Sequence, residues 1–533
     1  MNKFNHISKF KNRNLAEFFY SFAKSSPNHE ALNWEKGSLT YGQMLDYIEA
    51  FRTPLTGESN FVGILAAKSP IAYSAVQAIL AEGKAYVPLN PIFPASRNRY
   101  VVQKAKIDTL IVGEECATAL AEFLKEWTGP LRIITLDKPS AIRELVSLIP
   151  TGLVLVEAVL KFGMLPTPLV APAENRSAYV LFTSGSTGVP KGVRITHDNV
   201  FSYLESVLAA YPIYPQDRVT QTFDLTFDVS VHDQFVTWAS GATLVPFPDK
   251  ALFAPLAYAA EKKVTVWFSV PALAAFLESA RQVIPGALPQ VRLSLFAGEK
   301  LTWKTCQIWK SIAPHSRLAN LYGPTEATIV VIHFEIPEGF PEEHCHQGGI
   351  PIGRIFPTQR VVVLRENGTA CEAGEVGGMW VSGDQVAPGY LEEPEKTAER
   401  FVEREGVIWY RTGDLVAMEP GGIIQYEGRE DFQVKVMGYR IELGEIEHAL
   451  MKSSGSAFAI ADVAKIRNGQ EEIYCVLPKM YLDQKKEIKT KLKNQLPSYM
   501  IPRHLYFTDD IPFNANGKMD RGVLKLRATA GLL

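Results

Sequence analysis

Short apolar runs alternate with amphipathic stretches over the first 170 residues. The apolar run 61–67 predicts a buried strand, and residues 71–81 after it have the pattern of a helix. Apolar runs at 85–89 and 109–112 predict two further strands. Strands that alternate with helices in this way favour parallel sheets with crossover helices. The N-terminal part of the chain is therefore expected to be α/β.

The alternation continues and then gives way to a different pattern. Residues 177–182 predict a strand that leads directly into a segment rich in glycine and hydroxyl side chains, and residues 264–268 and 271–280 predict another strand and helix. From about residue 354 short strands are separated by turns rich in Gly, Asn and Glu. These strands are expected at 360–364, 378–382 and 407–410. The change predicts a β-rich subdomain.

A domain boundary is expected between residues 429 and 430, because 533 residues are too many for one core. Residues 1–429 would form a large core, and 430–533 a small, mobile α+β domain. Residues 483–496 place apolar side chains at helical spacing between lysines and end before Pro497. The 16 Lys and Arg against 13 Asp and Glu give 430–533 a net charge of +3. The lysines predict a solvated helix face, with a surface for an acidic partner as the alternative.

Composition excludes several classes of function. A net charge of −2 gives no reason to expect nucleic-acid binding. The most apolar region, 149–165, is interrupted by Glu157 and Lys161, so no membrane span is expected. The N-terminus has no apolar signal-peptide core. The five cysteines form no CxxC pair, which is typical of reduced thiols in a cytoplasmic protein without cysteine-bound metal.

The segment after the strand at 177–182 can bind an anion. It is rich in small and hydroxyl-bearing residues, namely Thr183, Ser184, Gly185, Ser186 and Thr187. Backbone N–H groups in such a loop approach a phosphate closely, and Lys191 adds a positive charge. No Gly-Lys-Ser/Thr follows, so this is not the common NTPase loop. A flexible linker is the alternative, but the position directly after an apolar strand favours phosphate binding.

Three later segments carry further candidate chemistry. Tyr322 beside a Gly-Pro turn can offer a stacking face, and Glu326 can ligate Mg2+. Asp414, after a glycine at the end of a predicted strand, can accept hydrogen bonds from ribose hydroxyls or form an Asx-turn. Lys435 and Lys518 lie at turns, where most lysines are simply exposed.

Taken together and in chain order, nine segments resemble the core motifs of the adenylate-forming superfamily, and within it the amino-acid adenylation domains of nonribosomal peptide synthesis. These segments are 39–41, 80–91, 181–192, 227–231, 320–328, 378–391, 410–415, 428–447 and 514–521. The chain departs from the family at Asn90, where Asp is usual, and at Asn514, where Thr is usual. The resemblance covers nearly the whole chain.

The resemblance implies an enzyme that joins a carboxylate to the α-phosphate of ATP, releases pyrophosphate and passes the acyl group to a thiol. It assigns ATP binding to Thr183, Ser184, Gly185, Ser186, Thr187, Lys191, Gly298, Asn320, Tyr322, Asp414 and Arg429. It implies that Thr325 contacts the α-phosphate, Glu326 helps to hold Mg2+, and Lys518 bridges the carboxylate, the ribose and the α-phosphate. Asp431 matches the hinge about which the C-terminal domain turns.

The same resemblance assigns the amino-acid pocket. Asp228 matches the residue that pairs with the α-ammonium group of an amino acid. The lining positions correspond to Val229, His232, Phe268, Leu295, Ala297, Leu321, Ile329 and Val330. Seven of these eight are apolar, which fits a compact apolar amino acid. The set resembles proline-activating domains, although His232 replaces the usual Gln and Leu321 the usual His. Valine, leucine, pipecolate and D-alanine stay as alternatives.

A thiol acceptor is implied as well. The chain ends 12 residues after Arg521 without a phosphopantetheine-bearing segment, so the expected acceptor is a separate acyl carrier protein. An acyl- or aryl-CoA ligase of the same superfamily is a competing interpretation, and Asp228 disfavours it. A catalytically silent scaffold is another, and the joint presence of Glu326, Asp414 and Lys518 disfavours that one.

Overall fold

The computed structural model describes residues 13–55, 59–136, 140–147, 152–172, 176–185, 189–466, 471–512 and 521–533. The chain divides into two compact units. The first comprises Met1–Pro91, Val102–Leu181 and Gly192–Glu430, and the second Ile92–Val101, Phe182–Lys191 and Asp431–Leu533. The domain boundary expected from the sequence stays a prediction. Among the described residues, no helix is both long enough and apolar enough to cross a membrane.

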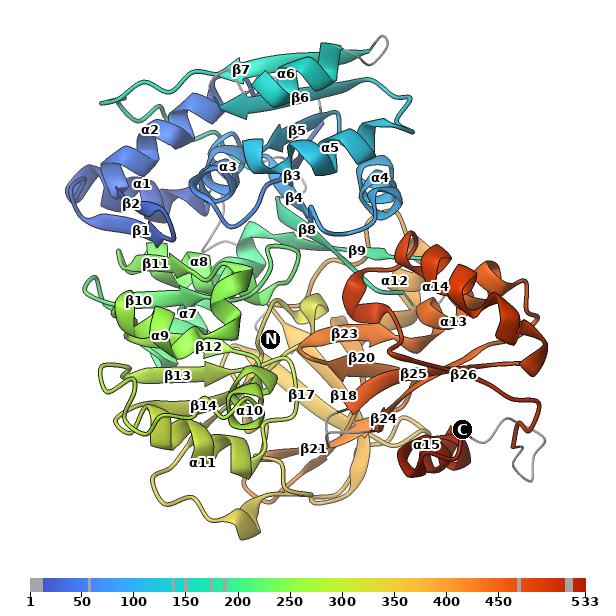
Figure 1. Cartoon of the computed structure of the whole chain (residues 1–533). Coiled ribbons are helices and arrows are strands. Elements are labelled where there is room, and N and C mark those ends of the chain that lie inside the picture. The colour runs from blue at the N-terminus through green and yellow to red at the C-terminus, as the bar shows by residue number, and fades with distance from the viewer. Residues whose placement is uncertain are drawn as a thin grey trace. The chain divides into compact units, whose positions relative to one another are not determined.

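A seven-stranded sheet forms the N-terminal part of the fold (Figure 1). In spatial order its strands are β7 (Leu153–Ala158), β6 (Leu131–Leu136), β5 (Thr109–Val112), β3 (Phe61–Leu65), β4 (Ala85–Leu89), β8 (Ser177–Thr183) and β9 (Lys191–Thr196). Strands β3 to β8 pair in parallel. The crossover helices are α3 (Pro70–Ala81), α4 (Ala95–Lys104), α5 (Ala117–Leu124) and α6 (Ser140–Ser147). The α/β prediction is confirmed here.

A nine-stranded sheet carries five of the candidate site residues, on three neighbouring strands (Figure 1). In spatial order its strands are β16 (Arg354–Ile355), β15 (Ile332–Ile336), β14 (Arg317–Tyr322), β13 (Leu293–Phe296), β12 (Val266–Ser269), β10 (Arg218–Gln221), β11 (Thr243–Pro246), β1 (Glu30–Trp34) and β2 (Gly37–Thr40). The strands from β14 to β1 pair in parallel, and the outer ones pair antiparallel.

Helices connect or flank these strands, and local signals set where they begin. They are α1 (Ala16–Ser25), α2 (Tyr41–Arg52), α7 (His197–Ala210), α8 (Val229–Ala239), α9 (Pro255–Glu261), α10 (Pro271–Ser279) and α11 (Trp303–Ile312). Thr40 caps α2 and Thr196 caps α7, each in a reciprocal pair with the residue three positions on. Helices α3, α9 and α10 begin with proline, whose missing N–H costs nothing in the first turn.

An antiparallel sheet confirms the predicted β-rich subdomain. Its strands are β17 (Gln359–Leu364), β18 (Val376–Gly383), β20 (Val407–Met418) and β19 (Phe401–Arg404), with β21 (Ile424–Arg429) on β20, and α12 (Pro394–Arg400) precedes β19. Strand β20 is longer than the expected 407–410, because it continues past Gly413 to pair with β21. Asp414 therefore lies inside a strand rather than at its end.

The second unit contains its own small α+β core. A hairpin of β22 (Gln433–Val436) and β23 (Tyr439–Glu442) leads into α13 (Leu443–Ser454). A three-stranded sheet of β24 (Ile460–Lys465), β25 (Glu471–Leu477) and β26 (His504–Phe507) follows, with α14 (Lys485–Lys493) and α15 (Arg521–Ala530). Ile488 and Leu492 of α14 are fully buried, as their spacing predicts. The helix is shorter than the expected 483–496, because residues Lys479–Gln484 form a 3₁₀ helix, η6.

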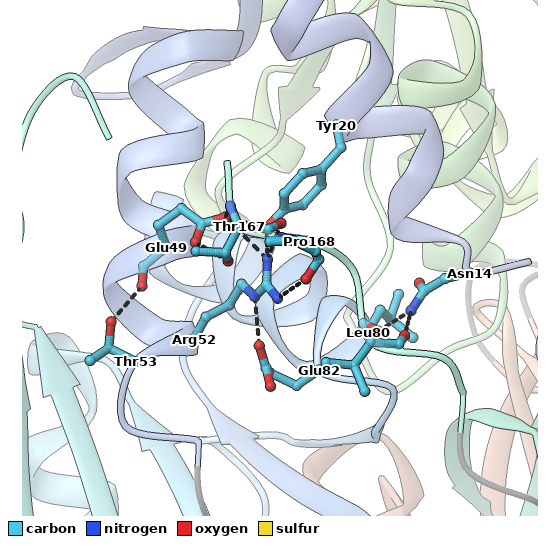
Figure 2. Close-up of polar contacts among 10 residues, drawn as sticks. Asn14, Tyr20, Glu49, Arg52, Thr53, Leu80, Glu82, Thr167 and Pro168 are labelled. Carbon is cyan, nitrogen blue, oxygen red and sulfur yellow. Dashed lines mark hydrogen bonds and ion pairs between the residues drawn. The ribbon is translucent and has the colours of Figure 1, made fainter. Parts of the chain in front are cut away.

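Arg52, at the end of α2, organises a buried polar network in the first unit (Figure 2). Its Nε donates to Glu82 at 2.7 Å, and its Nη1 contacts Glu49 at 3.2 Å. The guanidinium also donates to the carbonyl oxygens of Thr167 and Pro168, at 2.9 and 2.7 Å. The charge of Arg52 therefore balances the carboxylates of Glu49 and Glu82. Its hydrogen bonds to the carbonyl oxygens hold the irregular segment around Thr167 and Pro168 against α2.

Replacing Arg52 with Met should destabilise the first unit. Glu49, 2% exposed, would keep its charge without its cation, a change that costs about 3–5 kcal/mol in buried pairs. The midpoint of thermal unfolding should fall by several degrees. The control is Lys125→Met, which breaks an exposed pair with Glu122 worth about 0–1 kcal/mol. Equal midpoints for the two variants would contradict the role given to Arg52.

Candidate nucleotide and amino-acid site

The carboxyl end of β14 holds Asn320 in one orientation. Asn320 is 3% exposed, and its Nδ2 donates to the carbonyl oxygens of Ile350 and Pro351, at 3.3 and 3.0 Å. Because both amide hydrogens are used in this way, Oδ1 is the atom that can accept a hydrogen bond from a ligand.

Tyr322, Asp414 and Arg429 form a buried cluster, although they come from three separate motifs. Tyr322 Oη donates to Asp414 Oδ2, and Arg429 Nη1 donates to Asp414 Oδ1 at 2.7 Å. The side chains of Arg429 and Asp414 are 8% and 4% exposed. Burial, and then the Asp414 charge, raise the pKa of Tyr322 well above its usual value, so the phenol keeps its proton. The structure thus joins three of the sequence-predicted residues around one carboxylate.

A tight turn follows β14 and requires unusual backbone angles. A side chain at Gly323 would place a Cβ 2.3 Å from the Ile329 carbonyl oxygen, so only glycine fits. Thr328 and Ile329 have φ values of 57° and 71°, in the left-handed region that β-branched residues avoid. The Val331 N–H closes the turn on the Tyr322 carbonyl at 2.9 Å.

Gln385, which the sequence analysis did not single out, holds this turn in place. It is fully buried, and its Nε2 donates to the carbonyl oxygens of Val330 at 2.7 Å and Thr328 at 3.2 Å. Thr328 Oγ1 donates in return to the Gln385 carbonyl at 2.6 Å. These bonds offset the backbone strain, and the turn presents Thr325 at its start.

Glu326 is fully buried in the same turn. Its Oε1 accepts a hydrogen bond from Tyr390 Oη at 2.9 Å, and its carbonyl accepts one from the Ala387 N–H at 2.9 Å. Across the part of the chain that the structure describes, no three His, Cys, Asp or Glu side chains gather as a metal site. A single carboxylate is nevertheless what Mg2+ needs when substrate phosphates supply its other ligands. Glu326 therefore fits a metal that arrives with a nucleotide.

The glycine-rich segment is described in part. Thr183 ends β8, and its buried hydroxyl has no hydrogen-bond partner among the described residues. Ser184 Oγ donates to the Arg440 carbonyl at 2.9 Å, within the second unit. A Cβ at Gly185 would lie 2.1 Å from the Val189 carbonyl oxygen, so glycine is required there. Lys191 begins β9. Ser186, Thr187 and Lys518 lie outside the described residues.

The residues assigned to the amino-acid pocket come from the start of α8, from the carboxyl ends of neighbouring parallel strands and from the turn after β14. Asp228 directly precedes α8, and Val229 and His232 lie in its first turns. Phe268 and Leu295 are paired in register on β12 and β13, and Gly298 follows β13 with φ 92°. The nearly or fully buried members are His232, Phe268, Leu295, Ala297, Leu321, Ile329 and Val330, each at most 4% exposed. Val229 is partly buried.

His232 is the one polar member of that lining, and Tyr203 of α7 holds it. Tyr203 Oη and His232 Nδ1 are 2.6 Å apart. The imidazole meets the Phe268 ring edge-on, with centroids 4.7 Å apart and planes at 77°. Burial lowers the pKa of His232 to about 3, so the ring is neutral at physiological pH. No local sequence signal pointed to Tyr203, because its partner lies 29 residues away.

Asp431, the predicted hinge residue, opens the main segment of the second unit. Its Oδ1 accepts a hydrogen bond from the Gln433 N–H at 3.2 Å. Lys435 lies on β22, opposite Arg440 in the hairpin. The structure gives these positions, and the hinge role of Asp431 stays a prediction.

Comparison with known proteins places this arrangement among adenylating enzymes. Residues 19–391 match the family described as AMP-binding enzyme. The chain is 32% identical to the phenyloxazoline synthase MbtB of Mycolicibacterium paratuberculosis, over 95% of this chain and 41% of that protein. It is 30% identical to a D-alanine–D-alanyl carrier protein ligase of Lactiplantibacillus plantarum, over 95% of this chain and 97% of that protein.

A solved structure extends this comparison. The adenylation domain AlmE of Vibrio cholerae, in complex with glycyl-adenosine-5'-phosphate, superposes with a TM-score of 0.87 at 27% identity, over 99% of each chain. The chain thus spans less than half the length of the phenyloxazoline synthase, but nearly the full length of the carrier protein ligase and of AlmE.

Replacing Asp414 with Asn should destabilise the first unit, because Arg429 would keep a buried charge without its partner. We expect a loss of about 3–5 kcal/mol, seen as a lower midpoint of thermal unfolding. Tyr322→Phe removes one hydrogen bond to the same carboxylate and should cost about 1 kcal/mol. The double variant D414N/R429M should recover part of the loss. A D414N midpoint equal to that of Y322F would contradict a charge-centred cluster.

Proposed function

The chain belongs to the AMP-binding enzyme family, and we propose that it joins an amino acid to AMP at the expense of ATP, releasing pyrophosphate. One observation carries this proposal. The parallel strands β10, β12, β13 and β14 end at one edge of the nine-stranded sheet. Tyr322 of the Tyr322–Asp414–Arg429 cluster ends β14, and Phe268 and Leu295, proposed for the amino-acid pocket, lie on β12 and β13. Ligands of α/β sheets bind at the carboxyl ends of the strands.

The nucleotide roles follow from the contacts of each side chain. The Tyr322 ring can stack on adenine, and Asn320 Oδ1 can accept a hydrogen from its amino group. Asp414, held by Arg429, can accept hydrogen bonds from the ribose hydroxyls. Thr183 offers a hydroxyl without a partner among the described residues, which fits a phosphate ligand. Gly298 and Lys191 complete the proposed ATP-binding set.

The chemical step needs positioning and charge neutralisation more than acid–base catalysis. The amino-acid carboxylate attacks the α-phosphorus of ATP, the bond to the β-phosphate oxygen breaks, and pyrophosphate leaves. Thr325 would contact the α-phosphate, and Lys518 would bridge the reacting groups. Bound at Glu326, Mg2+ would supply further neutralisation of phosphate charge.

The amino acid itself is proposed from the pocket residues. Asp228 would pair with its α-ammonium group, and the apolar lining fits a compact side chain. L-Proline is the first candidate, because the lining set resembles proline-activating domains. Glycine and D-alanine form a second candidate class, which the similarity to AlmE and to the D-alanyl carrier protein ligase favours. We further propose that the aminoacyl group passes to the phosphopantetheine thiol of an acyl carrier protein, after the C-terminal domain turns about Asp431.

Pyrophosphate exchange across a panel of amino acids tests this function. We expect exchange that depends on a small amino acid, with L-proline, D-alanine and glycine in the panel. Lys518→Ala should slow it by about 2–4 kcal/mol, which is roughly thirty- to a thousandfold. Lys525→Ala, at an exposed position of α15, is the matched control and should leave exchange unchanged. Exchange with aryl or long-chain acids alone would overturn the proposal.

The exposed lysines of α14 are the proposed docking surface for the carrier protein. Lys485 and Lys486 are exposed, and Met480 and Leu482 beside them are 76% and 46% exposed. Such a mixed basic and apolar surface suits an acidic partner. The double variant K485E/K486E should slow loading of an acidic carrier about tenfold and leave pyrophosphate exchange intact. Lys24→Glu with Lys36→Glu, both exposed in the first unit, is the control, and equal loading by both double variants would exclude this surface.

A further inference from the structure

The Nε2 atom of His232 is a buried polar atom for which the described residues offer no hydrogen-bond partner. The residue is 1% exposed. A buried, unpaired donor or acceptor costs about 1–3 kcal/mol, and a ligand or a bound water is one way in which native proteins satisfy such a group.

The contact with Tyr203 assigns the proton on the imidazole. Burial raises the pKa of Tyr203 well above its usual value, with added effects of Asp233 and Asp228, so the phenol keeps its hydrogen. The acceptor for that hydrogen is His232 Nδ1, 2.6 Å away. Since the ring is neutral and Nδ1 accepts, the remaining hydrogen is on Nε2. This tautomer is inferred from the hydrogen-bond network, and it makes Nε2–H a donor.

The donor lies within the proposed amino-acid pocket. His232 follows Asp228 by four residues, which places the two side chains on the same face of α8. Its ring contacts Phe268, another lining residue, edge-on. The other seven lining side chains are apolar, and the carboxylate of Asp228 is proposed to pair with the α-ammonium group of the substrate. The acceptor that Nε2–H requires can therefore come from the substrate.

We propose that the Nε2–H of His232, oriented by Tyr203, selects an amino acid whose side chain carries a hydrogen-bond acceptor, such as a hydroxyl group. This inference rests on the proposed function and narrows its substrate class. It departs from unsubstituted L-proline and D-alanine, whose side chains have no acceptor. Among substrates of similar size it favours hydroxyproline over proline, serine over alanine and threonine over valine.

The free-energy cost of an unpaired donor predicts which substrates the pocket prefers. A side-chain oxygen that accepts from Nε2–H satisfies the buried donor, whereas the analogue without that oxygen leaves the donor unpaired. A site built to hydrogen-bond a substrate rejects the analogue more strongly than an apolar pocket rejects a missing methylene. We expect a ratio of kcat/KM between the two members of a pair of about ten- to a hundredfold.

The test is pyrophosphate exchange with matched pairs: threonine and valine, serine and alanine in both enantiomers, and cis- and trans-4-hydroxy-L-proline with L-proline. In the unaltered protein, in the pair with the fastest exchange, the member with the side-chain oxygen should have a kcat/KM about ten- to a hundredfold higher than the other member. His232→Leu removes the donor and should bring that ratio close to one, with KM for ATP unchanged. Tyr203→Phe leaves the imidazole of His232 in place but removes the hydroxyl that fixes its tautomer. The kcat/KM ratio should therefore fall to a value between those of the unaltered protein and His232→Leu.

The controls separate this inference from a general loss of structure. Tyr214→Phe, at a tyrosine that is 46% exposed, should leave the ratio intact. If His232→Leu does not fold, the ratio in Tyr203→Phe, together with its thermal midpoint, decides the question. Equal or better exchange with valine, alanine or proline, or exchange with glycine alone, overturns the inference and leaves the proposed function standing. Absence of exchange with every amino acid overturns the proposed function itself.

Discussion

Parallel pairing within the nine-stranded sheet is the constraint on which the candidate site depends. Because β10, β12, β13 and β14 run in the same direction, their carboxyl ends must meet at one edge. Phe268, Leu295 and Leu321, which are far apart in the chain, lie on three neighbouring strands that strand order brings side by side. The antiparallel return from β14 to β15 then requires the strained turn that presents Thr325 and Glu326.

Buried polar groups do different work in different parts of the first unit. Arg52 neutralises two carboxylates and binds backbone carbonyls, so its network is satisfied by protein groups and serves stability. The side-chain amide of Gln385 likewise donates its hydrogen bonds to backbone carbonyls of the turn after β14. The Nε2 of His232, by contrast, has no partner among the described residues, and the hydroxyl of Thr183 in the second unit has none either. Where such an atom faces a binding site, a ligand can complete its hydrogen bonding.

Sequence reasoning predicted what depends on local pattern and on motif. The strands at 85–89 and 109–112, the β-rich subdomain and the buried Ile488 and Leu492 follow from periodicity, and the structure confirms them. It missed Tyr203, Gln385 and Tyr390, because a residue that supports a site through a distant partner leaves no local signal. Asp414 was expected at a strand end, because the sequence alone does not show that pairing with β21 extends β20 beyond Gly413. The roles of all the candidate site residues stay predictions, and three of these residues, Lys518, Ser186 and Thr187, lie outside the described ones.

For the proposed amino-acid pocket, the residue types of the lining and the hydrogen bonds of its buried groups predict different substrates. Seven apolar residues out of eight suggest an apolar substrate, and each apolar contact discriminates between similar side chains by only about 1–3 kcal/mol. The proposed donor on His232 would change that balance, because leaving it unpaired would penalise every substrate that lacks an acceptor. The tautomer of His232 depends on a phenol from another helix, so the lining sequence alone does not contain this information. Under the proposed role of His232, substrate selection would depend on Tyr203, which is not itself a lining residue.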